Sequence, residues 1–210
     1  MNNCYLDAEA VITFFRMTGR KHIFITGSRG SGKSHLVNNM LKHMSDSFNL
    51  LQSHRTDTPQ VVIKSNLVAD NKEFVIGVPR TSGINPASKG NNMTIIEDGF
   101  INCAIPAIDT HLDTTPERLF VIDELGYLES SCIPFQKAVE KLLDNSHVLA
   151  VIRKQSTEFL NRIYNRKDVL VIDIDSTFET LSCIIMASGM SKRFGSNKLI
   201  TDFNGRSLFE

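Results

Sequence analysis

The feature that most constrains the fold of this chain is a glycine-rich turn between an apolar segment and a helix pattern. Residues 27–34 read Gly-Ser-Arg-Gly-Ser-Gly-Lys-Ser, which satisfies the pattern G-x-x-x-x-G-K-[ST]. The short apolar run His22–Thr26 precedes the turn, and helical spacing follows it over Ser34–Met44. A strand that passes through such a turn into a helix is typical of a phosphate-binding loop, so we expect an α/β domain of the P-loop class.

Each residue type in this turn has a chemical reason. Glycine accepts the positive φ angles that turn several backbone N–H groups toward one phosphate, and the following helix adds its unpaired N–H groups and its dipole. We expect Lys33 to place a cation on the β and γ phosphates and Ser34 to offer its hydroxyl to magnesium. Arg29 either contacts phosphate or is a solvated surface arginine. The expected nucleotide-binding residues are Gly27, Ser28, Arg29, Gly30, Ser31, Gly32, Lys33 and Ser34.

A second motif is a hydrophobic strand that ends in two acids. Leu119–Ile122 is apolar and Asp123 and Glu124 follow it directly, which is the Walker B form. We expect Asp123 to hold magnesium, directly or through water, and Glu124 to polarise an attacking water as a general base. A base beside the γ-phosphate favours hydrolysis over phosphotransfer, because a kinase must keep water away. The alternative for this acid pair is a strand that ends at an exposed turn next to Gly126.

Strand and helix patterns alternate along much of the chain. An amphipathic helix is expected over residues 7–18 with Gly19 as its stop, and a loop over residues 79–93, which are rich in Pro, Gly, Ser and Asn. Such alternation predicts a mainly parallel sheet with helices on both faces. Further strands are expected near Leu50 and over Val61–Ile63, Phe74–Val78, Val148–Ile152 and Val169–Ile174, and further helices over Phe135–Leu143 and Thr157–Tyr164.

Two later segments have competing interpretations. Arg153 directly follows the strand Val148–Ile152, so it is either a sensor that reaches the γ-phosphate, and then a catalytic residue, or a surface arginine. Residues 165–168 read Asn-Arg-Lys-Asp, close to the guanine-reading N-K-x-D motif. Arg166 stands where that motif has lysine, and the segment precedes a strand instead of following one. We therefore interpret it as a polar helix-to-strand turn and infer no guanine specificity.

The charge balance and the cysteines give no support for nucleic-acid, membrane or metal-binding functions. Lys and Arg together number 23, as do Asp and Glu, so the net charge gives no electrostatic reason to propose nucleic acid or a membrane surface as a partner. The four cysteines are scattered without metal-ligand spacing, and we expect them to be reduced. The N-terminus lacks signal-peptide character and no apolar run approaches the ~20 residues of a membrane span, so we expect a soluble, cytoplasmic protein.

Taken together, these motifs resemble the THEP-type nucleoside triphosphatases. The resemblance rests on residues 27–34, on the Asp-Glu-x-Gly-x-x-Glu run from Asp123 to Glu129, and on the strand that leads to Arg153; it spans about residues 20–176. It implies a RecA-like P-loop domain that hydrolyses ATP, GTP and other nucleoside triphosphates with Mg²⁺ and weak base selectivity. The aromatic and arginine-bearing hairpin of that family has only a loose counterpart here, in residues 53–56.

The last part of the chain resembles a different family. Residues 183–187 have the character of a buried strand, and residues 188–199 and 204–208 resemble the opening signature of MobA-like nucleotidyltransferases, which attach CMP or GMP to molybdenum cofactor. In that family the loop grips a nucleotide triphosphate, and Arg193 and Lys198 would be its charge partners here. The residues that fall on the signature are Gly189, Arg193, Gly195 and Lys198.

A nucleotidyltransferase domain needs more chain than this segment supplies. We therefore expect residues 1–180 to form the P-loop domain and residues 181–210 to be an incomplete N-terminal fragment of a truncated or fused domain, poorly ordered or peripheral and without transferase activity. The alternative is that the segment is an ordinary βα loop of the P-loop domain.

The sequence thus favours a Mg²⁺-dependent hydrolase of ATP or GTP with Lys33, Glu124 and Arg153 as catalytic residues. Two alternatives stay open. In one, the P-loop part assists a fused molybdenum-cofactor nucleotidyltransferase that uses CTP or GTP; in the other, the chain is a nucleotide-binding regulator without turnover. The expected partner is a nucleoside triphosphate, and homo-oligomerisation and a link to the molybdenum-cofactor pathway are left open.

Overall fold

The computed structural model describes residues 6–44, 47–80, 93–176, 202–203 and 206–207. The chain divides into two units, Met1–Phe178 and Glu179–Glu210. Within the described ranges, no helix has both the length and the apolar character needed to cross a membrane.

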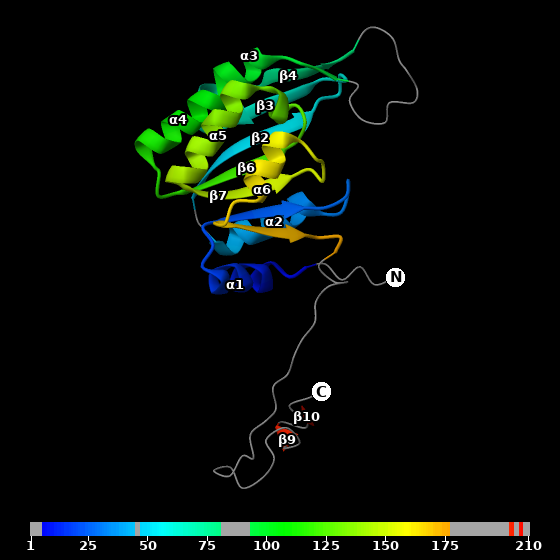
Figure 1. The fold of residues 1–210 in the computed structure, drawn as a ribbon, viewed down its shortest axis with the longest axis vertical. Helices are drawn as coiled ribbons and strands as arrows, with labels where there is room; N and C mark the ends of the chain where they lie inside the picture. The colour runs from blue at the N-terminus through cyan, green and yellow to red at the C-terminus, as the bar shows by residue number, and fades with distance from the viewer. Residues whose placement is uncertain (1–5, 45–46, 81–92, 177–201, 204–205, 208–210) are drawn as a thin grey trace. The chain divides into compact units, whose positions relative to one another are not determined.

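An eight-stranded sheet forms the centre of the first unit, in the order β5-β4-β3-β2-β6-β7-β1-β8 (Figure 1). The five strands from β2 to β8 in this order pair in parallel, whereas β3, β4 and β5 add an antiparallel edge beside β2. The expected mainly parallel sheet is confirmed, and the antiparallel edge is a finding of the structure. The strands are β1 (His22–Thr26), β2 (Phe48–Arg55), β3 (Val61–Ser65), β4 (Phe74–Pro79), β5 (Met93–Ile95), β6 (Leu119–Leu125), β7 (His147–Ile152) and β8 (Val169–Asp173).

Helices cover both faces of this sheet, as the alternating pattern predicted. Phe24, Phe120 and Ala150 contribute to one buried cluster together with residues of α4, α5 and α6, whereas Ile25, Val121 and Val151 pack with α1 and α2. Neighbours along a strand thus face opposite clusters, as the pleat requires. The helices are α1 (Ala8–Thr18), α2 (Lys33–Met44), α3 (Glu97–Gly99), α4 (Ile105–Thr114), α5 (Ile133–Asn145) and α6 (Glu158–Tyr164), with short helical segments η1 (Ala69–Asn71), η2 (Phe100–Ala104) and η3 (Glu129–Ser131).

Local capping explains where two of the expected helices begin and where one of them ends. The Asp7 carboxylate accepts a hydrogen bond from the Ala10 amide at the start of α1, and Gly19 closes the helix in the left-handed conformation. At the start of α6 the Thr157 hydroxyl accepts from the Leu160 amide. These caps satisfy backbone groups that the helix itself leaves unpaired.

The helical segment from Glu97 to Thr114, which includes the π-helix η2, was not expected from the sequence. Its inward face mixes large apolar side chains with the small Cys103, Ala104 and Ala107, and Pro106 lies in the first turn of α4. The buried positions nevertheless follow helical spacing, which is the signal that could have found the helix. These fully buried residues are Phe100, Cys103, Ala104, Ala107 and Ile108.

A buried polar group lies at the amino-terminal ends of the parallel strands. His111 Nε2 is 2.7 Å from Ser146 Oγ, and His111 Nδ1 is 2.8 Å from Asn49 Nδ2. All three side chains are buried, and the Ser146 hydroxyl also donates to the Pro116 carbonyl. Through Asn49 and Ser146, His111 ties α4 to β2 and to the start of β7, so we assign this buried group a structural role.

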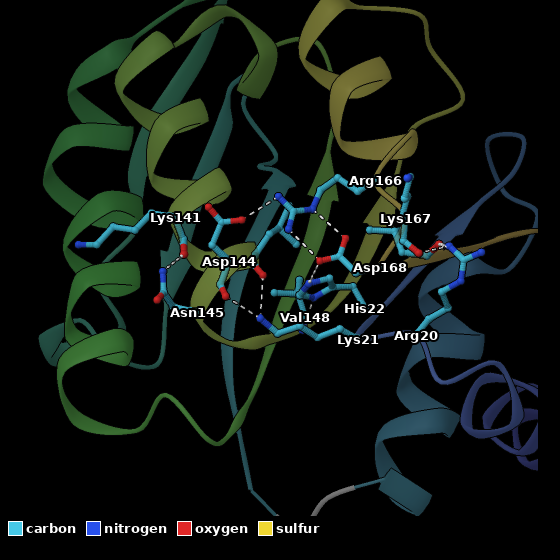
Figure 2. Close-up of polar contacts among 12 residues, drawn as sticks. Arg20, Lys21, His22, Lys141, Asp144, Asn145, Val148, Arg166, Lys167 and Asp168 are labelled. Atoms are coloured by element: carbon cyan, nitrogen blue, oxygen red, sulfur yellow. Dashed lines mark hydrogen bonds and ion pairs between the residues drawn. The ribbon is translucent and has the colours of Figure 1, made fainter.

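The segment 165–168 forms a polar turn between α6 and β8, which confirms its sequence interpretation. Figure 2 shows Arg166 between two carboxylates, with Nη1 2.9 Å from Asp144 Oδ1 and Nη2 2.8 Å from Asp168 Oδ2. Lys21 Nζ donates to the carbonyls of Leu143 and Asp144 at the end of α5. The turn therefore connects α6 to β8, and Arg166 also ties it to Asp144 of α5.

Several expectations fall outside the described residues. They include most of the loop expected over residues 79–93, the strand over residues 183–187, and the signature residues Gly189, Arg193, Gly195 and Lys198. In the second unit, β9 (Asp202–Phe203) pairs antiparallel with β10 (Arg206–Ser207). Cys103 and Cys132 are buried free thiols, as expected.

Candidate active site

The candidate site lies where the carboxyl ends of β1, β6 and β7 meet the start of α2. A cavity of about 830 Å³ opens there, between the glycine-rich loop and the ends of β2, β6 and β7. Carboxyl ends of parallel strands are the usual place for a ligand in open α/β sheets. The cavity is lined by Gly27, Ser28, Arg29, Gly30, Gly32, Lys33, Ser34, His35, Ser53, His54, Arg55, Val61, Glu124, Arg153, Lys154 and Gln155.

The loop itself has the backbone geometry of an anion-binding nest. Gly30 has φ of 78° and Gly32 has φ of 92°, in the left-handed region that glycine tolerates best. Lys33 opens α2, and its ammonium group donates to the carbonyls of Gly27 at 3.0 Å and Ser28 at 2.7 Å. The Lys33 side chain therefore folds back over the glycine-rich loop, where its ammonium group contacts the loop carbonyls.

Asp175, just beyond β8, holds the beginning of the loop. Its carboxylate accepts hydrogen bonds from the Ser28 amide at 2.7 Å and from the Ser28 hydroxyl at 2.6 Å. These hydrogen bonds are the main cause of the lowered pKa of Asp175. Lys154 Nζ lies 2.8 Å from Asp173 Oδ2 and 3.3 Å from Asp175 Oδ2, so the two acids also fix the lysine at the cavity wall. Sequence reasoning missed Asp175, although its place after a parallel strand was a usable signal.

Asp123 lies next to Ser34, one of the residues that line the cavity. Ser34 Oγ is 3.5 Å from Asp123 Oδ1, although the two residues are 89 positions apart in the chain. Burial raises the pKa of the Asp123 carboxyl, while the hydrogen bond from Ser34 works against that rise. The structure therefore brings together the two oxygen donors expected to hold magnesium.

Glu124 and Arg153 form an ion pair at the cavity wall. The Arg153 guanidinium Nε donates to Glu124 Oε1, and the Arg153 amide donates to the Leu125 carbonyl at 2.8 Å. A Cβ at Gly126 would lie 2.9 Å from Arg153 Cδ, so the glycine leaves room for the arginine stem. The arginine that follows β7 thus lies beside the penultimate residue of β6.

Glu129 is a buried residue that lines a small cavity together with Glu124 and Arg153. It is only 5% exposed, and its Oε2 accepts from the Gly126 amide at 2.8 Å while Oε1 lies 3.4 Å from Ser53 Oγ. Burial raises the pKa of Glu129 to about 7. Ser53 Oγ also lies 3.4 Å from both the amide and the carbonyl of Glu124, so Ser53 and Glu129 together brace the turn after β6.

The cavity carries an excess of positive charge. Among the described residues that line it, Glu124 is the only acid, and the five cations come from four different segments. A low-dielectric concave surface with such a charge excess attracts and concentrates polyanions. The cations are Arg29, Lys33, Arg55, Arg153 and Lys154.

Most of the residues singled out from the sequence converge on this cavity. Ser31 has a hydroxyl without a hydrogen-bond partner within the described structure and does not line the cavity, whereas the other seven residues of the loop do. Asp123 is not among the described residues that line the cavity, but its carboxylate lies 3.5 Å from the hydroxyl of Ser34, which does line it. Glu124 and Arg153 both line the cavity. Sequence reasoning did not single out Lys154 or Asp175, and it placed Arg55 only in a loose counterpart of a family hairpin.

The donor set is suited to a magnesium–nucleotide complex. Mg²⁺ prefers oxygen ligands and is commonly held by one or two protein oxygens together with phosphate oxygens and water. Ser34 and Asp123 offer one hydroxyl and one carboxylate, side by side. Main-chain N–H groups of the loop and the cations of the cavity then remain for the phosphates.

The chain is similar to known nucleoside triphosphatases. Residues 22–179 match the model of a family described as NTPase. The nucleoside-triphosphatase THEP1 of Thermotoga sp. (strain RQ2) is 26% identical over 155 residues, which cover 73% of this chain and 86% of that protein. THEP1 of Thermotoga maritima is 23% identical over 154 residues, with the same coverage.

Two solved structures share the fold. The crystal structure of THEP1 from the hyperthermophile Aquifex aeolicus has a TM-score of 0.58 at 17% identity and covers 75% of this chain and 92% of that chain. The solution structure of a human cancer-related nucleoside triphosphatase has a TM-score of 0.53 at 20% identity and covers 73% of this chain and 88% of that chain. At these identities the likeness concerns the fold alone.

Proposed function

This chain belongs to the NTPase family, whose model covers residues 22–179, and we propose that it is a Mg²⁺-dependent hydrolase of nucleoside triphosphates. The observation that carries the proposal is that Lys33, Ser34 and Glu124 line one cationic cavity and that Asp123 lies beside Ser34. These residues come from two distant segments, and a phosphate loop with a metal-side acid and a second acid is the set that phosphoanhydride hydrolysis requires.

The loop and Lys33 would bind the triphosphate. The ammonium group now donates to the Gly27 and Ser28 carbonyls, and the β and γ phosphates would offer it stronger, charged acceptors. Ser34 and Asp123 would hold the metal. Bound magnesium would neutralise charge on the phosphate oxygens.

Glu124 would act as the general base toward a water beside the γ-phosphate. Its ion pair with Arg153 suggests how the base could be controlled. A γ-phosphate near the cavity wall would compete for the guanidinium, and Glu124 would then be free to accept a proton. Arg153 thereby acquires the sensor role that its place after β7 suggested.

We extend the proposal to both ATP and GTP. The charged groups named above are suited to the triphosphate, which is common to all nucleotides. Weak base selectivity is also what the sequence resemblance implies. Comparable kcat/KM values for ATP, GTP, CTP and UTP would support this part, and a preference above about a hundredfold for one base would contradict it.

The decisive experiment measures phosphate release by the wild type and by two variants with matched controls. Lys33→Ala should lower hydrolysis by ~10²-fold or more, whereas Lys42→Ala, at the other end of α2, should not. Glu124→Gln should lower kcat by ~10²–10⁴-fold while nucleotide still binds, whereas the exposed Glu117→Gln at the opposite end of β6 should not. Equal rates in all five proteins would overturn the proposal.

Metal dependence is tested separately. Chelation of Mg²⁺ should abolish turnover, and Ser34→Ala should raise the Mg²⁺ concentration for half-maximal activity about tenfold, the loss expected for one ligand or its support. Turnover in excess chelator would contradict the magnesium part and leave nucleotide binding as a separate question.

Two further readings have specific support. Slow release of phosphate together with tight binding of nucleotide would favour a nucleotide-binding regulator without turnover. The observation in favour of this alternative is the Arg153–Glu124 ion pair, because Arg153 occupies the carboxylate that would act as the general base. For residues 181–210 we propose the opening of a MobA-like nucleotidyltransferase domain linked to molybdenum cofactor, supported by the sequence signature at Gly189, Arg193, Gly195 and Lys198. Incorporation of CMP or GMP into that cofactor by this 210-residue chain would contradict the expectation that the fragment is inactive.

A further inference from the structure

Arg55 ends strand β2 at the edge of the phosphate cavity. Gln52 pairs in register with Asp123 across the β2–β6 ladder, and Ser53 lies beside the backbone of Glu124. Side chains two residues apart on a strand point to the same face. Arg55 therefore shares the face of Ser53, one strand pleat closer to the solvent, and it lines both the main cavity and the small cavity above Glu129.

The two cations that follow β7 already have carboxylate partners. Arg153 is paired with Glu124, and Lys154 lies within ion-pair distance of Asp173 and Asp175. Across the described part of the chain, by contrast, no carboxylate lies within 4.0 Å of the Arg55 guanidinium, and no hydrogen bond from it is formed. An arginine that has no anionic partner among the described residues and that lines a cationic cavity is available to a ligand.

Tyr127 lies in the same part of the site as Arg55 and Arg153. Burial raises the pKa of the Tyr127 hydroxyl, and the positive charges of Arg153 and Arg55 oppose that rise. Glu124, Tyr127, Arg55 and Arg153 also line the same small cavity.

We propose that Arg55 is a further catalytic residue, which contacts the γ-phosphoryl group as it is transferred to water and stabilises the charge that develops there. It would be an arginine supplied by the chain itself, from the strand next to the one that carries the base. Arg153 would sense the γ-phosphate and release Glu124, whereas Arg55 would act in the transition state. This inference rests on the proposed hydrolase function.

The chemistry favours arginine over a simple point charge at this place. During phosphoryl transfer, charge is spread over the equatorial oxygens of the γ-phosphate and the departing oxygen, and a planar guanidinium can donate to two of them at once. Removal of one such donor in other enzymes costs ~10²–10³-fold in kcat, and removal of an arginine finger costs more. A lysine should recover only part of the loss.

The test compares Arg55→Ala, Arg55→Lys and the control Arg16→Ala, an exposed arginine on α1. Two quantities are measured with Mg²⁺ present: kcat for ATP hydrolysis, and the Kd for ADP with and without aluminium fluoride, which mimics the transferring phosphoryl group. We expect Arg55→Ala to lower kcat at least ~10²-fold and to abolish most of the tightening by aluminium fluoride, with the Kd for ADP alone changed less than about threefold. Arg55→Lys should lie between wild type and Arg55→Ala, and Arg16→Ala should behave as wild type.

The outcomes separate this inference from the proposed function. An active wild type that loses activity in Lys33→Ala but not in Arg55→Ala would overturn the role of Arg55 and leave the hydrolase standing. Equal weakening of ADP binding with and without aluminium fluoride in Arg55→Ala would also overturn it, because Arg55 would then bind the ground state. A wild type without hydrolysis or ADP binding would overturn both.

Discussion

The Arg153 guanidinium is paired with the Glu124 carboxylate, across 29 positions of sequence and from neighbouring parallel strands. Arg153, the expected sensor, is thus in direct contact with Glu124, the expected general base. The side chains are 43% and 22% exposed, so solvent screens the pair and its contribution to the free energy of unfolding should be below about 1 kcal/mol. The pair therefore contributes little to stability, and its proposed role is control of Glu124.

Arg153→Ala should reduce the discrimination between nucleoside triphosphate and diphosphate. If the guanidinium moves to the γ-phosphate, its removal should weaken binding of a non-hydrolysable ATP analogue about tenfold and leave ADP unaffected, since one charge-assisted hydrogen bond is lost. Titration calorimetry on wild type, Arg153→Ala and the exposed Arg118→Ala measures both affinities. An unchanged ratio between analogue and ADP in Arg153→Ala would show that Arg153 is no sensor.

Two glycines with the same backbone constraint allow the role of the loop geometry to be isolated. Gly30 has φ of 78° and Gly19 has φ of 63°, and a Cβ at either would meet nothing within 4 Å. Alanine should therefore cost each about 1 kcal/mol of stability through backbone strain alone. Gly30→Ala should also weaken ADP binding about tenfold or more, because the loop amides turn away from the phosphates, whereas Gly19→Ala at the end of α1 should not. Equal ADP affinities in the two variants would contradict the nest geometry.

Glu129 should make the protein less stable as the pH rises toward neutrality. Its pKa in the folded protein is about 7, against an ordinary value of 4.5, so the folded state binds more protons than the unfolded chain between these values. The free energy of unfolding should then fall as pH rises from 4.5 to 7, by about 3 kcal/mol from this group. Glu129→Gln keeps the shape and cannot ionise. Its stability relative to wild type in urea titrations should increase over that window; a constant difference would mean that Glu129 does not titrate there.

His22 should make the protein less stable as the pH falls, which is the opposite of the effect expected from Glu129. It is fully buried, its Nδ1 accepts from the Val148 amide at 3.2 Å, and its Nε2 lies 3.4 Å from Asp168 Oδ2 without hydrogen-bond geometry (Figure 2). Burial lowers the pKa of His22 from 6.5 to about 4, although Asp168 opposes the shift. The unfolded chain therefore binds more protons between these values, and stability should fall by about 3 kcal/mol as pH drops from 6.5 through 4.

The variant His22→Asn tests this linkage. An asparagine carbonyl can accept the Val148 amide and does not titrate, so the variant, though less stable at neutral pH, should lose less stability than wild type between pH 6.5 and 4. His147→Asn, the exposed histidine that begins β7, is the matched control. Parallel stability curves for wild type and His22→Asn would show that another group causes the acid sensitivity.

Local sequence rules determined the parts of this protein that depend on neighbouring residues. The pattern of residues 27–34 determined a loop, because only glycine readily adopts the φ angles found at Gly30 and Gly32. Asp7 and Gly19 determined where α1 begins and ends, and apolar runs of the right length determined the parallel strands. Since ligands bind at the carboxyl ends of such strands, Asp123, Glu124 and Arg153 could be proposed for the site before the structure was known.

Only the tertiary structure decided which of these ends meet. The order β2-β6-β7-β1-β8 sets Glu124 beside Arg153, Asp175 on Ser28 and Arg55 on the wall of the cavity, and none of these contacts has a local signal. The same holds for the antiparallel edge and the helix Glu97–Thr114. The reason is physical: backbone preferences act over a few residues, whereas strand neighbours and side-chain pairs are selected by burial and charge over the whole sheet.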